Sequence, residues 1–265
     1  MNGNDLNFFK NWFASFTKSF YFKNEEDQQN IILKVEHTYN VCVNIIKIAG
    51  DLGFDDNAMM LAETTALFHD LGRFPQYAKY KTFKDNISIN HGLLGARTLI
   101  EEKILQRLSE KEQNLIVQAV KFHNTFRIPK LNNDAVILFL KLIRDADKLD
   151  ILRVFIEYYE TPLDKRASAA GLGLIDSPEY SKEILTCFHK RQIPSYTTLK
   201  TLCDFKLMKL TWLYDLNFQD TFKLLLERNY INRLVRYLPD AEEINRAVEA
   251  LKEFVRQKAS AQEVF

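Results

Sequence analysis

The chain has 265 residues, of which 46% are hydrophobic and 27% are charged, as in an ordinary globular protein. This length is sufficient to bury a sizeable core, and the composition argues against intrinsic disorder. Thirty-six basic and 35 acidic residues leave a formal net charge of +1, so the sequence shows no electrostatic footprint for nucleic acid or an anionic membrane.

The first half of the chain is expected to be helical, because only 8 glycines and 6 prolines interrupt the whole sequence. Helices are predicted over residues 5–22 and 24–53, and Asp56 is predicted to cap a third helix that ends near the HDLGR segment. Residues 74–87 are aromatic and basic without a clear period, which predicts a loop. Ser88 is expected to cap the helix that follows this loop.

The remainder of the chain is predicted to be helical over about residues 110–124, 134–159 and 241–257. Residues 162–177 form the weakest segment and predict a mobile loop. No β-alternation is present, so the expected fold class is all-α. We place the boundary between a core of residues 1–165 and a C-terminal helical extension of residues 166–265, packed on the core, near residue 165.

Three widely spaced cysteines without a CxxC pattern argue against both a disulfide framework and a cysteine zinc site. Reduced thiols are typical of a reducing cytoplasm. The N-terminal region has no basic segment followed by an apolar run, and no uninterrupted apolar stretch reaches the roughly 18 residues of a membrane span. We therefore expect a cytoplasmic protein without a nucleic-acid or membrane partner, and the sequence leaves its oligomeric state open.

Candidate metal ligands stand out in three of the predicted helices. His69 and Asp70 are adjacent at a helix end, and imidazole with carboxylate suits a divalent ion such as Zn, Mn, Fe, Co or Ni. His37 lies on the apolar face of its predicted helix and therefore points inward. Asp147 is surrounded by apolar residues four positions away on either side, and a carboxylate facing a core is costly unless it is paired or bound to a metal.

The order of these residues resembles the HD superfamily of metal-dependent phosphohydrolases. The strings EHTYNV, LFHDLGRF and RDADKLD carry His37, His69 with Asp70, and Asp147 in the sequence of the family blocks, over roughly residues 30–160. The resemblance implies an HD-domain helical bundle. It also implies one or two bound divalent ions (Mn, Mg, Fe, Co, Ni or Zn) held by these four residues.

Two further histidines, His91 and His123, fall between the HD pair and Asp147. Several HD subgroups have a similar H…HD…H…H…D order and use the additional histidines for a second metal or for the substrate phosphate. The resemblance therefore implies that both histidines are metal ligands or catalytic groups, together with Asp70. A histidine that only caps a helix or bonds within the core is the structural alternative.

The segment after the HD pair supplies candidate substrate-binding residues. Arg73 is a cation that directly follows the metal pair, and Tyr80 and Phe83 offer aromatic surfaces for a base. Uncharacterised HD proteins contain a similar string here, and this resemblance adds Asp85 and Ser88 as pocket residues. Asp150 is expected to form at most a supporting ion pair with a neighbouring lysine.

The function that these residues favour is hydrolysis of a phosphoester of a small metabolite, such as a nucleotide, by metal-activated water. Arg73, His91 or His123 would neutralise charge on the phosphoryl group. Two alternatives remain open at this stage. Some HD proteins, the inositol oxygenase group among them, hold two irons and activate oxygen, and a non-catalytic HD module would bind a ligand without turnover.

Overall fold

The structure, a computed structural model, describes residues 1–162, 166 and 174–261. Helices are the regular elements of these ranges, which confirms the all-α fold class, and one isolated bridge pairs Ile175 with Thr201. The chain divides into unit 1, Met1–Asp150, and unit 2, Ile151–Phe265. The division falls within a helix, fifteen residues before the predicted boundary at 165, and the predicted loop at 162–177 lies mainly outside the described residues.

The first two helices of unit 1 are α1 (Gly3–Lys18) and α2 (Glu25–Ala49), followed by the short helix η1 (Gly50–Leu52). Helix α1 buries one face, with Phe9 and Phe13 fully covered. Asn24 caps α2 by accepting a hydrogen bond from the Asp27 amide at 2.9 Å. The helix predicted over residues 24–53 is therefore confirmed as α2 followed by η1, and Gly53 comes next in the left-handed conformation.

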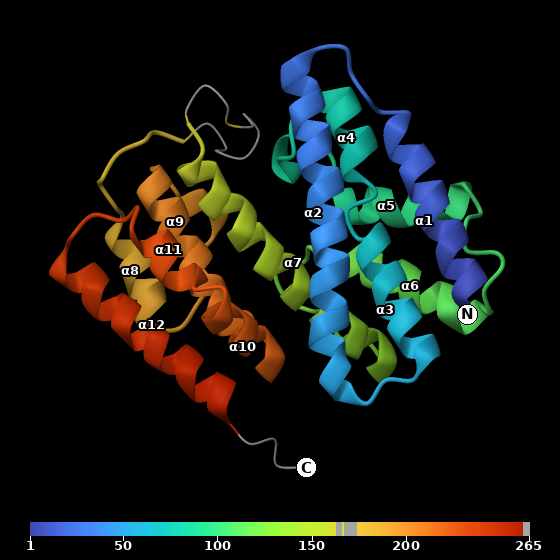
Figure 1. Cartoon of the computed structure of the whole chain (residues 1–265). Coiled ribbons are helices and arrows are strands. Elements are labelled where there is room, and N and C mark those ends of the chain that lie inside the picture. The colour runs from blue at the N-terminus through green and yellow to red at the C-terminus, as the bar shows by residue number, and fades with distance from the viewer. Residues whose placement is uncertain (163–165, 167–173, 262–265) are drawn as a thin grey trace. The chain divides into compact units, whose positions relative to one another are not determined.

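Helix α3 (Asp56–Phe68) lies alongside α2 (Figure 1). Its cap is Asp55, one residue before the predicted cap, and it accepts a hydrogen bond from the Ala58 amide at 2.7 Å. The prediction of a loop directly after the HD pair is wrong, because α4 covers Arg73–Tyr80. Pro75 is the third residue of α4, where the helix does not need its missing N–H group.

The short 3-10 helix η2 (Asp85–Ile87) follows α4. The next two helices, α5 (His91–Glu101) and α6 (Glu110–Phe122), pack against each other. Asn90 caps α5 through the Leu93 amide at 2.9 Å, so the prediction of Ser88 as the cap is wrong. Ser109 and Glu112 form a reciprocal capping box at the start of α6.

Helix α7 (Asp134–Glu160) contributes its first part to unit 1 and the remainder to unit 2. In unit 1 it is tied to α2, because the Asn44 side-chain amide donates to the carbonyl of Ala146 at 3.1 Å. Both groups are buried, so this bond fixes the position of α7 opposite His37.

Unit 2 is built around α9 (Leu202–Thr211), in which every residue is buried. The remaining helices of this unit are α8 (Lys182–His189), η5 (Tyr196–Thr198), η6 (Trp212–Asp215), α10 (Gln219–Glu227), α11 (Tyr230–Val235) and α12 (Glu242–Ser260). Helix α12 packs on α8 and α10 through an apolar face and keeps its charged face outside. The helical content predicted for this part of the chain is confirmed.

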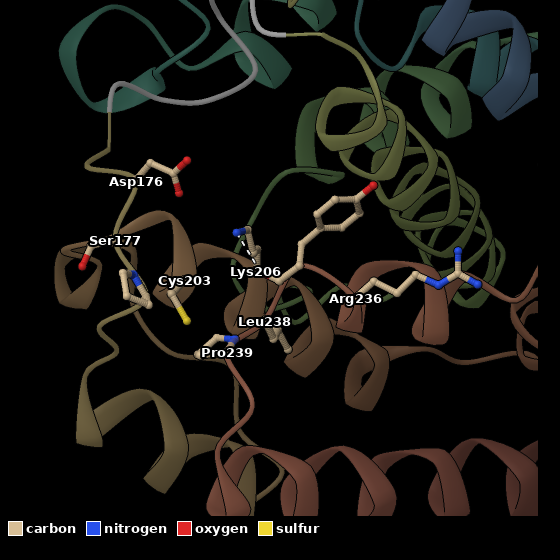
Figure 2. A pocket seen from close by; sticks show the side chains of 9 residues that line it. Asp176, Ser177, Cys203, Lys206, Arg236, Leu238 and Pro239 are labelled. Atoms are coloured by element: carbon tan, nitrogen blue, oxygen red, sulfur yellow. Dashed lines mark hydrogen bonds between the residues drawn. The ribbon is translucent and has the colours of Figure 1, made fainter.

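An open pocket of about 320 Å³ lies in unit 2 (Figure 2). Lys206 donates a hydrogen bond to the carbonyl of Tyr237 at 2.9 Å and lies over the Tyr159 ring. The pocket residues are Asp176, Ser177, Pro178, Cys203, Lys206, Arg236, Tyr237, Leu238 and Pro239. The contacts of Lys206 are thus made within the protein, and the pocket is open to the surface.

None of the helices in the described ranges combines the length and the apolar character that crossing a membrane requires.

Candidate metal centre

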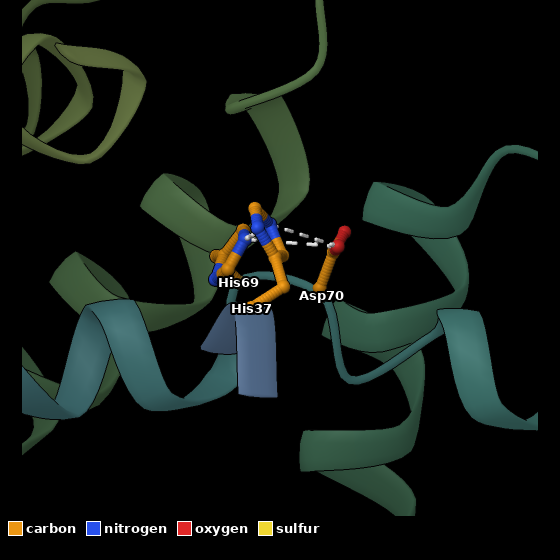
Figure 3. Close-up of side chains that lie close together, drawn as sticks. All are labelled: His37, His69 and Asp70. Atoms are coloured by element: carbon orange, nitrogen blue, oxygen red, sulfur yellow. Dashed lines mark hydrogen bonds and ion pairs between the residues drawn. The ribbon is translucent and has the colours of Figure 1, made fainter. Parts of the chain in front are cut away.

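Four residues predicted from the sequence meet in unit 1. His37 comes from the middle of α2, His69 from the end of α3 with Asp70 after it, and Asp147 from α7. Figure 3 shows the rings of His37 and His69 beside each other and opposite the Asp70 carboxylate. The Nε2 atom of His37 lies 3.4 Å from His69 Nε2, 3.6 Å from Asp70 Oδ2 and 3.1 Å from Asp147 Oδ1. Two imidazoles and two carboxylates thus converge on one position.

A second group forms on the other side of the same carboxylate. His91, the first residue of α5, places Nε2 3.2 Å from Asp70 Oδ1, and His123, at the end of α6, places Nε2 3.7 Å from it. The two Nε2 atoms are 3.0 Å apart. His37, His69 and Asp70 form one set of potential metal ligands, and Asp70, His91 and His123 form another, all five residues being buried. Asp70 belongs to both sets.

The Nδ1 atom of each of these histidines is held by an acceptor. His69 and His123 donate to the carbonyls of Ala66 and Val120, each at 2.7 Å. His37 donates to Asp150 Oδ2 at 2.7 Å, and His91 to Asp85 Oδ2 at 2.7 Å. Since Nδ1 carries the proton in the neutral ring, the Nε2 lone pairs face each other within each set. Such lone pairs repel one another unless a proton or a metal ion lies between them, so the donor set fits a metal.

The charges at the site are strongly biased toward the forms that bind metals. Burial would raise the pKa of Asp70, but the Lys34 ammonium, Arg73 and the neighbouring histidines hold it well below its usual range. Burial would also raise the pKa of Asp147, and its close contacts with His37 and His69 lower it further than burial raises it. Burial and the nearby charge of Arg73 lower the pKa of His91 to about 3. Both carboxylates are therefore ionised and His91 is neutral at pH 7.

The segment between α4 and α5 is anchored on Asp85. This carboxylate binds His91 and accepts hydrogen bonds from Arg73 Nη1 at 2.9 Å, Gln76 Nε2 at 2.9 Å and Asn124 Nδ2 at 3.0 Å. Burial would raise the pKa of Asp85, but the hydrogen bond from His91 and the charge of Arg73 hold it far below the usual value. Asp85 therefore acts on the centre through His91.

Of the other predicted pocket residues, Arg73, Phe83 and Ser88 lie beside the centre or support the segment next to it, whereas Tyr80 does not. Arg73 Nε lies 3.4 Å from Asp70 Oδ1, while its Nη1 also donates to the carbonyl of Phe83, and the Phe83 ring is partly exposed. Ser88 accepts from Gln76 Nε2 at 2.9 Å and so supports the segment. The Tyr80 ring is 38% exposed and faces Lys79, and no contact described for the chain joins it to the metal ligands.

The backbone brings the HD pair and His91 together through glycine. A Cβ added to Gly72 would lie 2.2 Å from the carbonyl oxygen of His91 and 2.7 Å from the amide of Gly95. These are backbone atoms that cannot move aside as a flexible side chain would. Only glycine at residue 72 allows α4 and α5 to begin this close together.

The comparisons with known proteins agree with this geometry. Residues 35–152 match the family model of the HD domain, and the match includes every potential ligand described above. This part of the chain is an HD domain. The recognition made from the three sequence blocks is thereby confirmed. No curated protein and no solved structure matches the chain.

Three residues near the ligands were not predicted from the sequence, in whole or in part. Lys34 places Nζ 2.7 Å from Asp70 Oδ2 and was not singled out. Asp150, expected only to pair with a lysine, is 1% exposed and binds His37. Asn124 reaches both Asp85 and Asn90. The available signal was helical spacing, because Lys34 precedes His37 by three residues and Asp150 follows Asp147 by three.

Proposed function

We propose that this chain is a metal-dependent phosphohydrolase that acts on a phosphoester of a small metabolite, with nucleotides as the first candidates. The HD domain family broadly consists of metal-dependent hydrolases. The observation that carries the proposal is the shared carboxylate: Asp70 faces two histidines with Oδ2 and two others with Oδ1.

In this proposal, His37, His69, Asp70 and Asp147 hold one divalent ion, and Asp70, His91 and His123 hold a second. When bound, such ions lower the pKa of a coordinated water and polarise a phosphoryl oxygen. Asp150 and Asp85 keep the Nδ1–H tautomers of His37 and His91, so that both Nε2 atoms are available as ligands. The short Nε2–Nε2 distance favours the ligand role of His91 and His123 over direct proton transfer to a leaving group.

The substrate class is supported by the groups at the solvent side of the ligands. The side chains of Lys34, Arg73 and Asp147 remain 16%, 15% and 19% exposed, whereas those of His37, His69 and Asp70 are 4% exposed or less. A substrate must therefore approach past the two cations, which suit a phosphate. The Phe83 ring lies 5.5 Å from Lys34 Nζ and 5.8 Å from Arg73 Cζ and offers a surface for a planar base.

The test combines metal analysis with a substrate screen. Protein purified without added metal is analysed for its metal content, and its hydrolysis of nucleotides and other phosphoesters is measured with several divalent ions. We expect turnover that a chelator abolishes and that D70A lacks. Absence of turnover on every phosphoester, together with two irons per chain and an iron absorption spectrum, would favour the oxygenase alternative instead.

A further inference from the structure

The side chain of Lys34 contacts one of the potential metal ligands. Its ammonium lies 2.7 Å from Asp70 Oδ2, and this is the oxygen that faces His37 Nε2 at 3.6 Å and His69 Nε2 at 3.7 Å. A residue for which the sequence made no prediction is therefore in direct contact with a potential metal ligand. The geometry places its charge beside the position that an ion would take.

We propose that Lys34 is a phosphate-binding residue of this centre, contacting a non-bridging oxygen of the substrate phosphoryl group. The inference rests on the proposed function, because it assigns a ligand class to the same site. The one alternative is that Lys34 serves only as the counter-ion of Asp70.

The first argument concerns hydrogen-bonding capacity. An ammonium group has three N–H donors, and within the described residues one hydrogen bond, to Asp70, uses one of them. The Lys34 side chain is 16% exposed, so it is not sealed off from solvent. A phosphate has several acceptor oxygens and can satisfy the remaining donors.

The second argument concerns charge. In the metal-free protein the negative charge of Asp70 holds the Lys34 ammonium in place. The positive charge of Lys34 in turn contributes to the low pKa of Asp70. A divalent ion on Asp70 Oδ2 would offset that charge and leave Lys34 without a full counter-ion. An anionic ligand bound to the same ion would again give Lys34 a counter-ion. The flexible four-carbon side chain of lysine allows the ammonium to move toward that ligand.

The third argument is a comparison with Arg73, the other cation at the site. Arg73 Nη1 is bound to Asp85, Gln76 and the carbonyl of Phe83, so the guanidinium is fixed as an anchor of the segment between α4 and α5. Lys34 has the Phe83 ring on one side, at 5.5 Å, and Asp70 on the other. Lys34 is thus the cation with more freedom to bind a ligand.

The test measures the affinity of the metal-loaded protein for inorganic phosphate by calorimetric titration. The variants are K34M, which removes the charge, K34R, which retains it, and the control K47M, which alters an exposed lysine of the same helix. We expect K34M to weaken phosphate binding roughly ten- to a hundredfold, the usual effect of losing a charge-assisted hydrogen bond, with unchanged metal content. K34R should retain most of the affinity, and K47M all of it.

Two results of the phosphate and metal measurements would overturn the inference. K34M could bind phosphate as tightly as the wild type, or it could lose the metal, in which case Lys34 acts on the ion through Asp70. The proposed function fails separately: wild-type protein without phosphoester turnover, but with phosphate binding that depends on Lys34, refutes the hydrolase and retains the binding residue. Turnover with the same kcat/KM in K34M and wild type retains the hydrolase and refutes the binding residue.

Discussion

The hydrogen bond between Asp150 and His37 gives the sharpest prediction about the metal centre. The D150A variant removes a carboxylate that is 1% exposed and accepts from His37 Nδ1 at 2.7 Å. Without it, the His37 ring loses its fixed tautomer and the charge that raises the basicity of Nε2. Losing such a partner typically weakens metal affinity ten- to a hundredfold, or about 1.4–2.8 kcal/mol.

The assay is a competition titration of the metal-free protein with a chromogenic chelator. D150N should lie between D150A and the wild type, since an amide oxygen still accepts the proton of Nδ1 but carries no charge. D134A alters an exposed aspartate at the start of the same helix and should bind metal like the wild type. If D150A also binds metal like the wild type while retaining the fold, Asp150 does not orient His37 and the reasoning is refuted.

Three further outcomes are expected. D70A should reduce metal binding at both sets of ligands, whereas H123A should reduce binding only at the set that contains His123. Elemental analysis measures the metal content of the two variants, and equal contents would contradict a shared Asp70. G72A should lower the free energy of unfolding by about 1–3 kcal/mol in denaturant titrations, because its Cβ overlaps backbone atoms, while G50A, with nothing within 4 Å, should have little effect. Nitrogen NMR of the metal-free protein should show His91 unprotonated down to about pH 4, since its pKa is lowered to about 3 from 6.5. The unfolded chain binds this proton first, so the contribution of His91 to stability is present above pH 6.5 and declines as the pH falls toward 3; protonation near 6.5 in the folded protein would contradict this.

The helices were predictable where hydrophobic period and capping residues agreed. Helix α2 and helix α7 are long and periodic, and the sequence located both within a few residues. Helix α4 was missed because it is eight residues long, contains Pro75 and begins directly after the HD pair. Its first turn tolerates proline, but sequence pattern alone cannot distinguish that position from a loop.

The centre was predictable to the extent that its residues carry a family pattern. The structure brings His37, His69, Asp70 and Asp147 together as expected, with His91 and His123 on the other side of Asp70. The supporting contacts follow from tertiary placement, which the spacing of residues does not encode. Nothing in the local sequence of Asp85 indicates that it would bind His91, Arg73 and Asn124 at once.

If both proposed ligand sets bind an ion, the double use of Asp70 links their occupancies. A cation on Oδ2 draws electron density from the whole carboxylate and makes Oδ1 a weaker donor for a second cation, and repulsion between the two ions acts in the same direction. Linkage requires that each ion weaken the binding of the other by the same factor. In the proposed two-ion centre, the ions would therefore be taken up in two steps of different affinity, and the concentration of free metal in the surroundings would set how many ions are bound.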